Sequence, residues 1–123
     1  MLAAFEKQKY LNLKTYRKSG VGVTTPVWFV QDGNLLYVRT VADSGKVKRI
    51  RNFPKVNIAP CKMDGKLLGD WVQANAREIL DAEIDNKVDR LLGKKYGLMK
   101  TIFSMAGRRD GRKNTILELK ESE

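Results

Sequence analysis

A run of hydroxyl and cationic side chains between residues 39 and 51 has the composition of a phosphate-binding site. The first of these residues end a strand-like segment, and the others open a segment with helical spacing. The start of a helix presents unpaired backbone N–H groups and partial positive charge, to which a hydroxyl and a full charge can be added. An ordinary solvated basic helix face is the alternative. The candidate anion ligands are Arg39, Thr40, Ser44, Lys46, Lys48 and Arg49.

A second segment, Val23–Trp28, is unusual for a strand because it contains Pro26. Proline gives no N–H to a strand ladder and belongs at an edge or a bulge. A planar heterocycle could lie against apolar side chains here, with backbone amides at its polar edge. A kinked edge strand without a ligand is the alternative. The candidate residues for contact with such a ring are Thr24, Thr25, Pro26 and Val27.

The composition excludes several kinds of chemistry. The chain has no histidine and one cysteine, Cys61, so imidazole metal sites and an internal disulfide are excluded. No carboxylate pair suggests a general acid and base, and we predict no catalytic side chain and no metal site. Lysine and arginine exceed aspartate and glutamate by 24 to 14, and this excess favours an anionic partner.

Length and hydropathy indicate one soluble domain. A chain of 123 residues with 42% hydrophobic and 31% charged residues fits a single globular domain over residues 1–123. Neither a signal-peptide pattern nor a long apolar stretch is present, so we expect a cytoplasmic location and no membrane partner.

Periodicity predicts mainly strands, interrupted by helices. Alternating apolar residues, turn signals such as Asp32-Gly33, and one long segment that a bend would divide indicate antiparallel strands. Such an arrangement favours a β-barrel with helices at its openings, an architecture that oligonucleotide-binding barrels share. The predicted strands cover residues 10–17, 21–29, 35–40, 56–59, 67–80 and 115–119; the predicted helices cover 2–5, 45–52 and 84–105, with a basic loop at 107–113.

Five segments, taken in order and spacing, resemble the deazaflavin-associated branch of the pyridoxamine 5′-phosphate oxidase-like split barrels. The resemblance covers roughly residues 3 to 120 and is densest before Cys61. The substrate-binding C-terminal residues of the true oxidases find no match. The segments are Lys9–Arg17, Gly22–Phe29, Leu36–Thr40, Ser44–Asn52 and Pro54–Val56.

The resemblance implies a mainly β (α+β) fold, a six-stranded antiparallel split β-barrel with flanking helices. It also implies a homodimer that holds two molecules of FMN or coenzyme F420 in grooves between the subunits. By position, Lys46 would meet the cofactor phosphate, with Arg39, Thr40 and Ser44 near it, and residues 24 to 27 would border the ring. Lys48 and Arg49 are further candidates.

The function that follows is a flavin- or deazaflavin-dependent oxidoreductase that transfers hydride to or from a small organic substrate. The cofactor carries the hydride, so the lack of a side-chain acid or base is compatible with this role. A non-catalytic flavin carrier is one alternative. A basic nucleic-acid-binding barrel is another, although the strands show few exposed aromatics among basic residues, so we do not expect nucleic acid as the partner.

Overall fold

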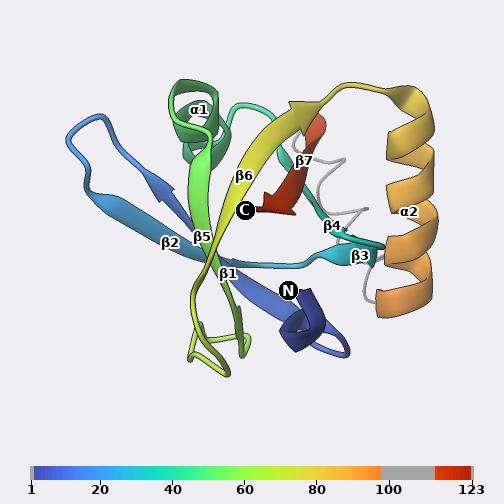
Figure 1. Cartoon of the computed structure of the whole chain (residues 1–123). Helices are drawn as coiled ribbons and strands as arrows, with labels where there is room; N and C mark the ends of the chain where they lie inside the picture. The colour runs from blue at the N-terminus through green and yellow to red at the C-terminus, as the bar shows by residue number, and fades with distance from the viewer. Residues whose placement is uncertain (1, 98–112, 123) are drawn as a thin grey trace.

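The computed structural model describes residues 2–97 and 113–122, which form a curled sheet with two α-helices and a short 3₁₀ turn (Figure 1). In chain order, the elements are η1 (Leu2–Phe5), β1 (Tyr10–Tyr16), β2 (Gly22–Val27), β3 (Val30–Asp32), β4 (Leu35–Val41), α1 (Gly45–Asn52), β5 (Lys55–Cys61), β6 (Val72–Ile79), α2 (Ala82–Tyr96) and β7 (Asn114–Glu121).

All paired strands are antiparallel, in the order β2-β1-β5-β6-β7-β4-β3. The sheet curls into a half-barrel compatible with a split barrel, and β2 and β3 are its two edges. The mainly β prediction with flanking helices is confirmed. The predicted count of six strands is wrong, because the described residues form seven.

The extra strand is β3, which begins at Val30, just beyond the predicted strand 21–29; the last two residues of that prediction, Trp28 and Phe29, lie between β2 and β3. The backbone N–H of Phe29 donates to Tyr96 Oη at 3.0 Å, and the carbonyl of Phe29 accepts from Lys95 Nζ at 2.9 Å. The Trp28 ring stacks on Tyr96 with centroids 4.1 Å apart. Side chains of α2 therefore take the hydrogen bonds that a continuous strand would have made, and β3 pairs with β4 instead of β1.

The predicted strand 67–80 is too long, and part of the predicted helix 84–105 lies outside the described residues. The predicted strand 67–80 is ordered as β6 only from Val72 to Ile79, while Leu67 makes a single bridge to Cys61. At Gly69 a Cβ would lie 2.8 Å from Pro60 Cγ, so the chain packs closely there. Helix α2 ends at Tyr96, and the predicted helical residues 98–105 and the loop residues 107–112 lie outside the described residues.

The core has two parts, one for each helix. Inside the half-barrel, alternate strand residues such as Leu13 and Ile58 pack with Val47 and Ile50, which anchor α1 over one end. On the opposite side of the sheet, Val88 and other residues of α2 pack against β3, β4 and β7. None of the helices in the described ranges is long and apolar enough to cross a membrane.

Candidate functional site

Helix α1 begins without the side-chain cap that its sequence offers. Ser44 is the N-cap residue, with φ −68° and ψ 156°, yet its hydroxyl makes no capping hydrogen bond and no acidic residue occupies the first turn. Ser44 Oγ is buried and has no hydrogen-bond partner among the residues that the structure describes. A buried hydroxyl without a partner is unfavourable, so this arrangement fits an added anion better than an empty helix end.

Lys46 and Arg49 add positive charge beside this helix start. The two residues are three positions apart, so they share one face of α1. Burial, followed by the nearby charge of Arg49, lowers the pKa of the Lys46 ammonium. Burial and the charge of Arg17 lower the pKa of the Arg49 guanidinium, whose Nε donates to Thr15 Oγ1 at 2.6 Å. Like charges held together in this way favour an anion between them.

Lys46 has no carboxylate partner within residues 2–97 and 113–122. Lys48 lies on the exposed side of α1, away from the face that Lys46 and Arg49 share. Thr40 is half-buried near the end of β4, opposite Thr115, whose buried hydroxyl also has no hydrogen-bond partner among the described residues. Two candidates therefore stand out at the helix start: Ser44, with a buried hydroxyl that has no hydrogen-bond partner among the described residues, and Lys46, with no carboxylate partner among them.

Arg39 is placed differently, because its guanidinium is engaged within the chain. Nη1 lies 2.9 Å from Asp89 Oδ1 and Nη2 lies 3.0 Å from Asp85 Oδ1. Its Nη2 also reaches the backbone carbonyl of Asp85 at 3.2 Å. These contacts join β4 to α2 and neutralise the charge of Arg39, so we do not include Arg39 in the anion site below.

The second predicted segment lies on an edge of the sheet. Strand β2 pairs on one side with β1, where Pro26 lies opposite Asn12, and is the last strand in the sheet order. Thr24 is exposed, and Thr25, Pro26 and Val27 are half-buried. The outer edge of β2 has no neighbouring strand among the described residues, which agrees with the edge position that Pro26 favours.

One cation near the site was not among the sequence candidates. Arg17 lies in the β1–β2 turn, and its charge acts on Arg49. The only sequence signal was a basic residue at the end of a predicted strand, which is common on surfaces. Its proximity to α1 depends on how β1 packs against that helix.

These observations define a class: a small half-barrel of antiparallel strands with a serine N-cap and cations at the start of a helix, and with β2 at one edge of the described sheet. The chain matches the family described as pyridoxamine 5′-phosphate oxidase over residues 1–121. The match spans nearly the whole chain. The protein therefore belongs to this family, the flavin-binding split-barrel family that its sequence motifs resemble.

Solved structures share the fold at low sequence identity. The haem-storage protein HutZ from Vibrio cholerae is 18% identical, with a TM-score of 0.72 over 96% of this chain and 84% of that one. An FAD-binding protein from Mesorhizobium loti is 12% identical, with a TM-score of 0.66 over 98% and 84%. A structure described as an F420 reductase is 17% identical, with a TM-score of 0.57 over 99% and 93%. No curated protein matches the chain.

Proposed function

We propose that this protein binds FMN or coenzyme F420 and acts as an oxidoreductase on a small organic substrate. The observation that carries the proposal is the buried Ser44 hydroxyl at the start of α1, which has no hydrogen-bond partner among the described residues and precedes the half-buried Lys46 in the chain. Membership of the family and the fold shared with an F420 reductase support the choice of cofactor class. The family also shares its fold with a haem-storage protein, so the redox activity needs a direct test.

The residues of this chain would hold and orient the cofactor. The Ser44 hydroxyl and the Lys46 ammonium would donate hydrogen bonds to the phosphate, and backbone N–H groups at the start of α1 would add partial positive charge. Arg49, fixed by Thr15, would add a second full charge behind them. The backbone of Thr25 and Val27 would meet the polar edge of the ring. When bound, the flavin or deazaflavin supplies hydride transfer.

A homodimer is part of this proposal. One half-barrel leaves the outer edge of β2 open, and a second subunit would provide the opposite wall of a ring site. Large apolar side chains are exposed in the segment between β5 and β6, with Met63 72% and Trp71 38% accessible. Such exposure is typical of a surface that a second copy covers. Light scattering should give twice the 14.0 kDa mass of the chain; a stable monomer that binds flavin tightly would contradict the shared site.

The experiment that tests the function is a parallel titration of the purified protein with FMN, F420 and single-stranded DNA. We expect saturable binding of one of the two cofactors and only weak, salt-sensitive binding of DNA, because nonspecific DNA binding falls steeply with salt. Hydride transfer is then measured by mixing the reduced cofactor complex with candidate organic acceptors. Tight DNA binding at moderate salt, with no affinity for either cofactor, would overturn the proposal.

A further inference from the structure

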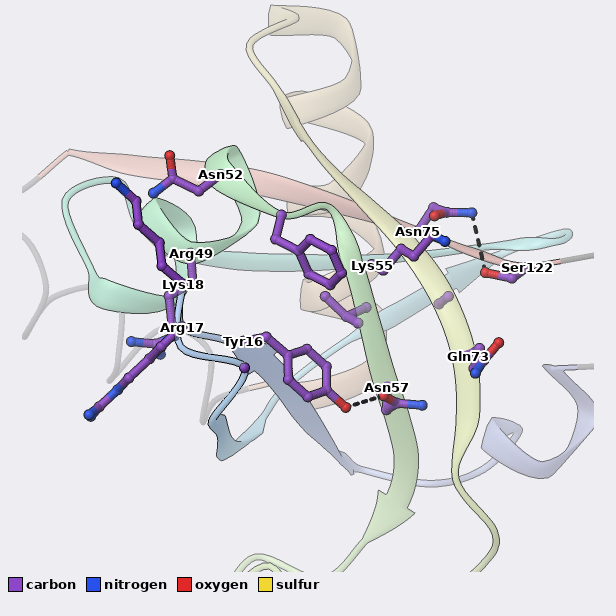
Figure 2. Close-up of a pocket in the computed structure, with 14 residues that line it drawn as sticks. Tyr16, Arg17, Lys18, Arg49, Asn52, Lys55, Asn57, Gln73, Asn75 and Ser122 are labelled. Carbon is purple, nitrogen blue, oxygen red and sulfur yellow. Dashed lines mark hydrogen bonds between the residues drawn. The ribbon is translucent and has the colours of Figure 1, made fainter.

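A groove of about 850 Å³ lies over the ends of β1, β5 and β6 (Figure 2), and its lining includes the core residues Val56 and Ala74. It is bounded by the β1–β2 turn, the end of α1 and the starts of β5 and β6. Tyr16 and Asn57 face it from neighbouring strands, whereas their neighbours Thr15 and Ile58 are buried. This volume falls within the range of small-molecule sites.

The charged side chains that line the groove, among the described residues, are all positive. Arg17, Lys18 and Arg49 lie together at one end, as Figure 2 shows, and Lys55 lines the wall. No aspartate or glutamate lines it among the described residues. Arg49 is held by Thr15, so part of the positive charge is fixed before a ligand arrives. A site with several cations and no carboxylate selects an anion.

The remainder of the groove is apolar and amide-bearing. Phe53 is 45% exposed, and its ring meets Tyr16 edge-on with centroids 6.2 Å apart. Tyr16 donates its hydroxyl hydrogen to Asn57 Oδ1, which leaves the Asn57 amide group as a donor. Gln73 and Asn75 stand at the end away from Arg17, Lys18 and Arg49, and Asn75 lies opposite Lys55 in the sheet. Exposed aromatic faces beside amides suit a flat ligand with a few polar groups.

We propose that this groove binds a small organic anion with a flat apolar body. The anionic group meets Arg17 and Lys18, and the body lies against Phe53 and Tyr16. The site is separate from the proposed phosphate position, because neither Ser44 nor Lys46 lines the groove. Arg49 lies between the two positions, since a Cβ on Gly45 would be 2.8 Å from its Nη1.

The test compares 2-naphthoate with 2-naphthamide, which has the same rings and no charge. Calorimetry on the wild-type protein should show that the carboxylate binds about tenfold or more tightly than the amide, as a charge-assisted hydrogen bond predicts. The double variant Arg17→Ala/Lys18→Ala should lose this preference. The matched control Lys62→Ala/Lys66→Ala removes the same charge from the distant β5–β6 connection and should retain the preference.

A third variant tests the apolar part of the groove. Phe53→Ala should weaken both probes to a similar extent, because it removes contact area and no charge. Equal affinity of the wild-type protein for the two probes would overturn the proposal, as would a preference that survives loss of Arg17 and Lys18. If that double variant changes self-association and leaves naphthoate affinity unchanged, the groove is an interface between copies and the proposal is wrong.

Variants can show separately whether the groove and the proposed cofactor site bind their ligands. Lys46→Ala should reduce FMN or F420 affinity and leave naphthoate affinity within about twofold, because salt screens a charge outside the groove. Phe53→Ala, at a groove residue outside the proposed cofactor contacts, should show the reverse pattern. Failure of only one pattern identifies which of the two sites is wrong.

Discussion

The cations near the two helices differ in whether carboxylates pair with them. Near α2, Arg39 contacts Asp85 and Asp89, and Lys87 contacts Asp32. At the face of α1 that carries Lys46, no carboxylate neutralises the cations among the described residues. Arg51 is the exception on α1, since it faces away from Lys46 and pairs with Glu78 at 3.0 Å.

This difference separates cations that are paired within the chain from cations that could receive an anion. A cation paired inside the chain joins two elements, and its removal changes stability. Unpaired cations that repel each other at a helix start contribute little to folding, and they become favourable when an anion binds. A net charge of +10 alone could not distinguish these roles, because both kinds of residue contribute equally to it. The partners in the folded chain make the distinction.

The largest expected effect is on cofactor affinity. Lys46→Ala should weaken binding of FMN or F420 by about 1.5–3 kcal/mol, the cost of losing a charge-assisted hydrogen bond to phosphate. The free energy of unfolding should change by less than about 0.5 kcal/mol, since Lys46 has no carboxylate partner among the described residues. Calorimetric titration and urea unfolding measure the two quantities. Lys66→Ala is the charge-matched control, and unchanged affinity for Lys46→Ala would remove this residue from the site.

Arg39→Ala should show the opposite pattern. We expect the free energy of unfolding to fall by about 1–2 kcal/mol, because the side chain is only 18% exposed and joins β4 to α2 through two carboxylates. Affinity of the folded protein for cofactor should be unchanged. Arg77→Ala, which removes a 71% exposed partner of Glu118, should cost less. A loss of cofactor affinity with unchanged stability would place Arg39 in the phosphate site, where the sequence motif put it.

Ser44→Ala tests whether the helix start is built for an anion. The substitution should weaken cofactor binding by about 0.5–1.5 kcal/mol, through loss of one hydroxyl donor. The unfolding free energy should stay the same or rise, because the buried Ser44 Oγ has no partner to lose among the described residues. The exposed Ser19→Ala serves as control. A clear loss of stability in Ser44→Ala would show that the hydroxyl caps the helix after all.

The smallest expected effect concerns Lys95, a half-buried lysine of α2. Burial lowers its pKa to about 8, so above that pH the folded protein releases a proton that the unfolded chain retains. Stability contributed by this group therefore rises as the pH increases from 7.5 to 9.0. The rise should be under about 1 kcal/mol and absent in Lys95→Met, when urea unfolding is followed at both pH values. Identical pH profiles of the two proteins would show that burial does not perturb Lys95.

The spacing of apolar residues and the position of Pro54 predicted helix α1 and the strands, because these elements depend on neighbouring residues in the chain. Helix α1 was predicted over 45–52 because Val47 and Ile50 have helical spacing and Pro54 stops the segment. The strands were predicted from alternation, and the observed core confirms that period for Leu11 and Leu13. Ser44 was a candidate anion ligand for a local reason, its position before a basic helix, but the lack of a hydrogen-bond partner for its hydroxyl among the described residues is known only from the structure.

Long-range contacts account for what the sequence did not reveal. The break between β2 and β3 depends on hydrogen bonds between the backbone of Phe29 and the side chains of Lys95 and Tyr96, which are 66 and 67 residues away in the chain. The pairing of Arg39 with Asp89 spans 50 residues. Neither contact leaves a periodic signal, so the motif around Arg39 could indicate a phosphate ligand but not the competing carboxylates.

We propose above that the start of α1 recognises the phosphate of a flavin or deazaflavin. The most direct measurement compares the affinities for FMN and riboflavin, or for F420 and its phosphate-free chromophore, in the wild-type protein and in Ser44→Ala/Lys46→Ala. The wild type should prefer the phosphorylated ligand by about tenfold or more, and the preference should largely disappear in the double variant. A wild-type protein without preference, or a double variant that retains it in full, would contradict the claim.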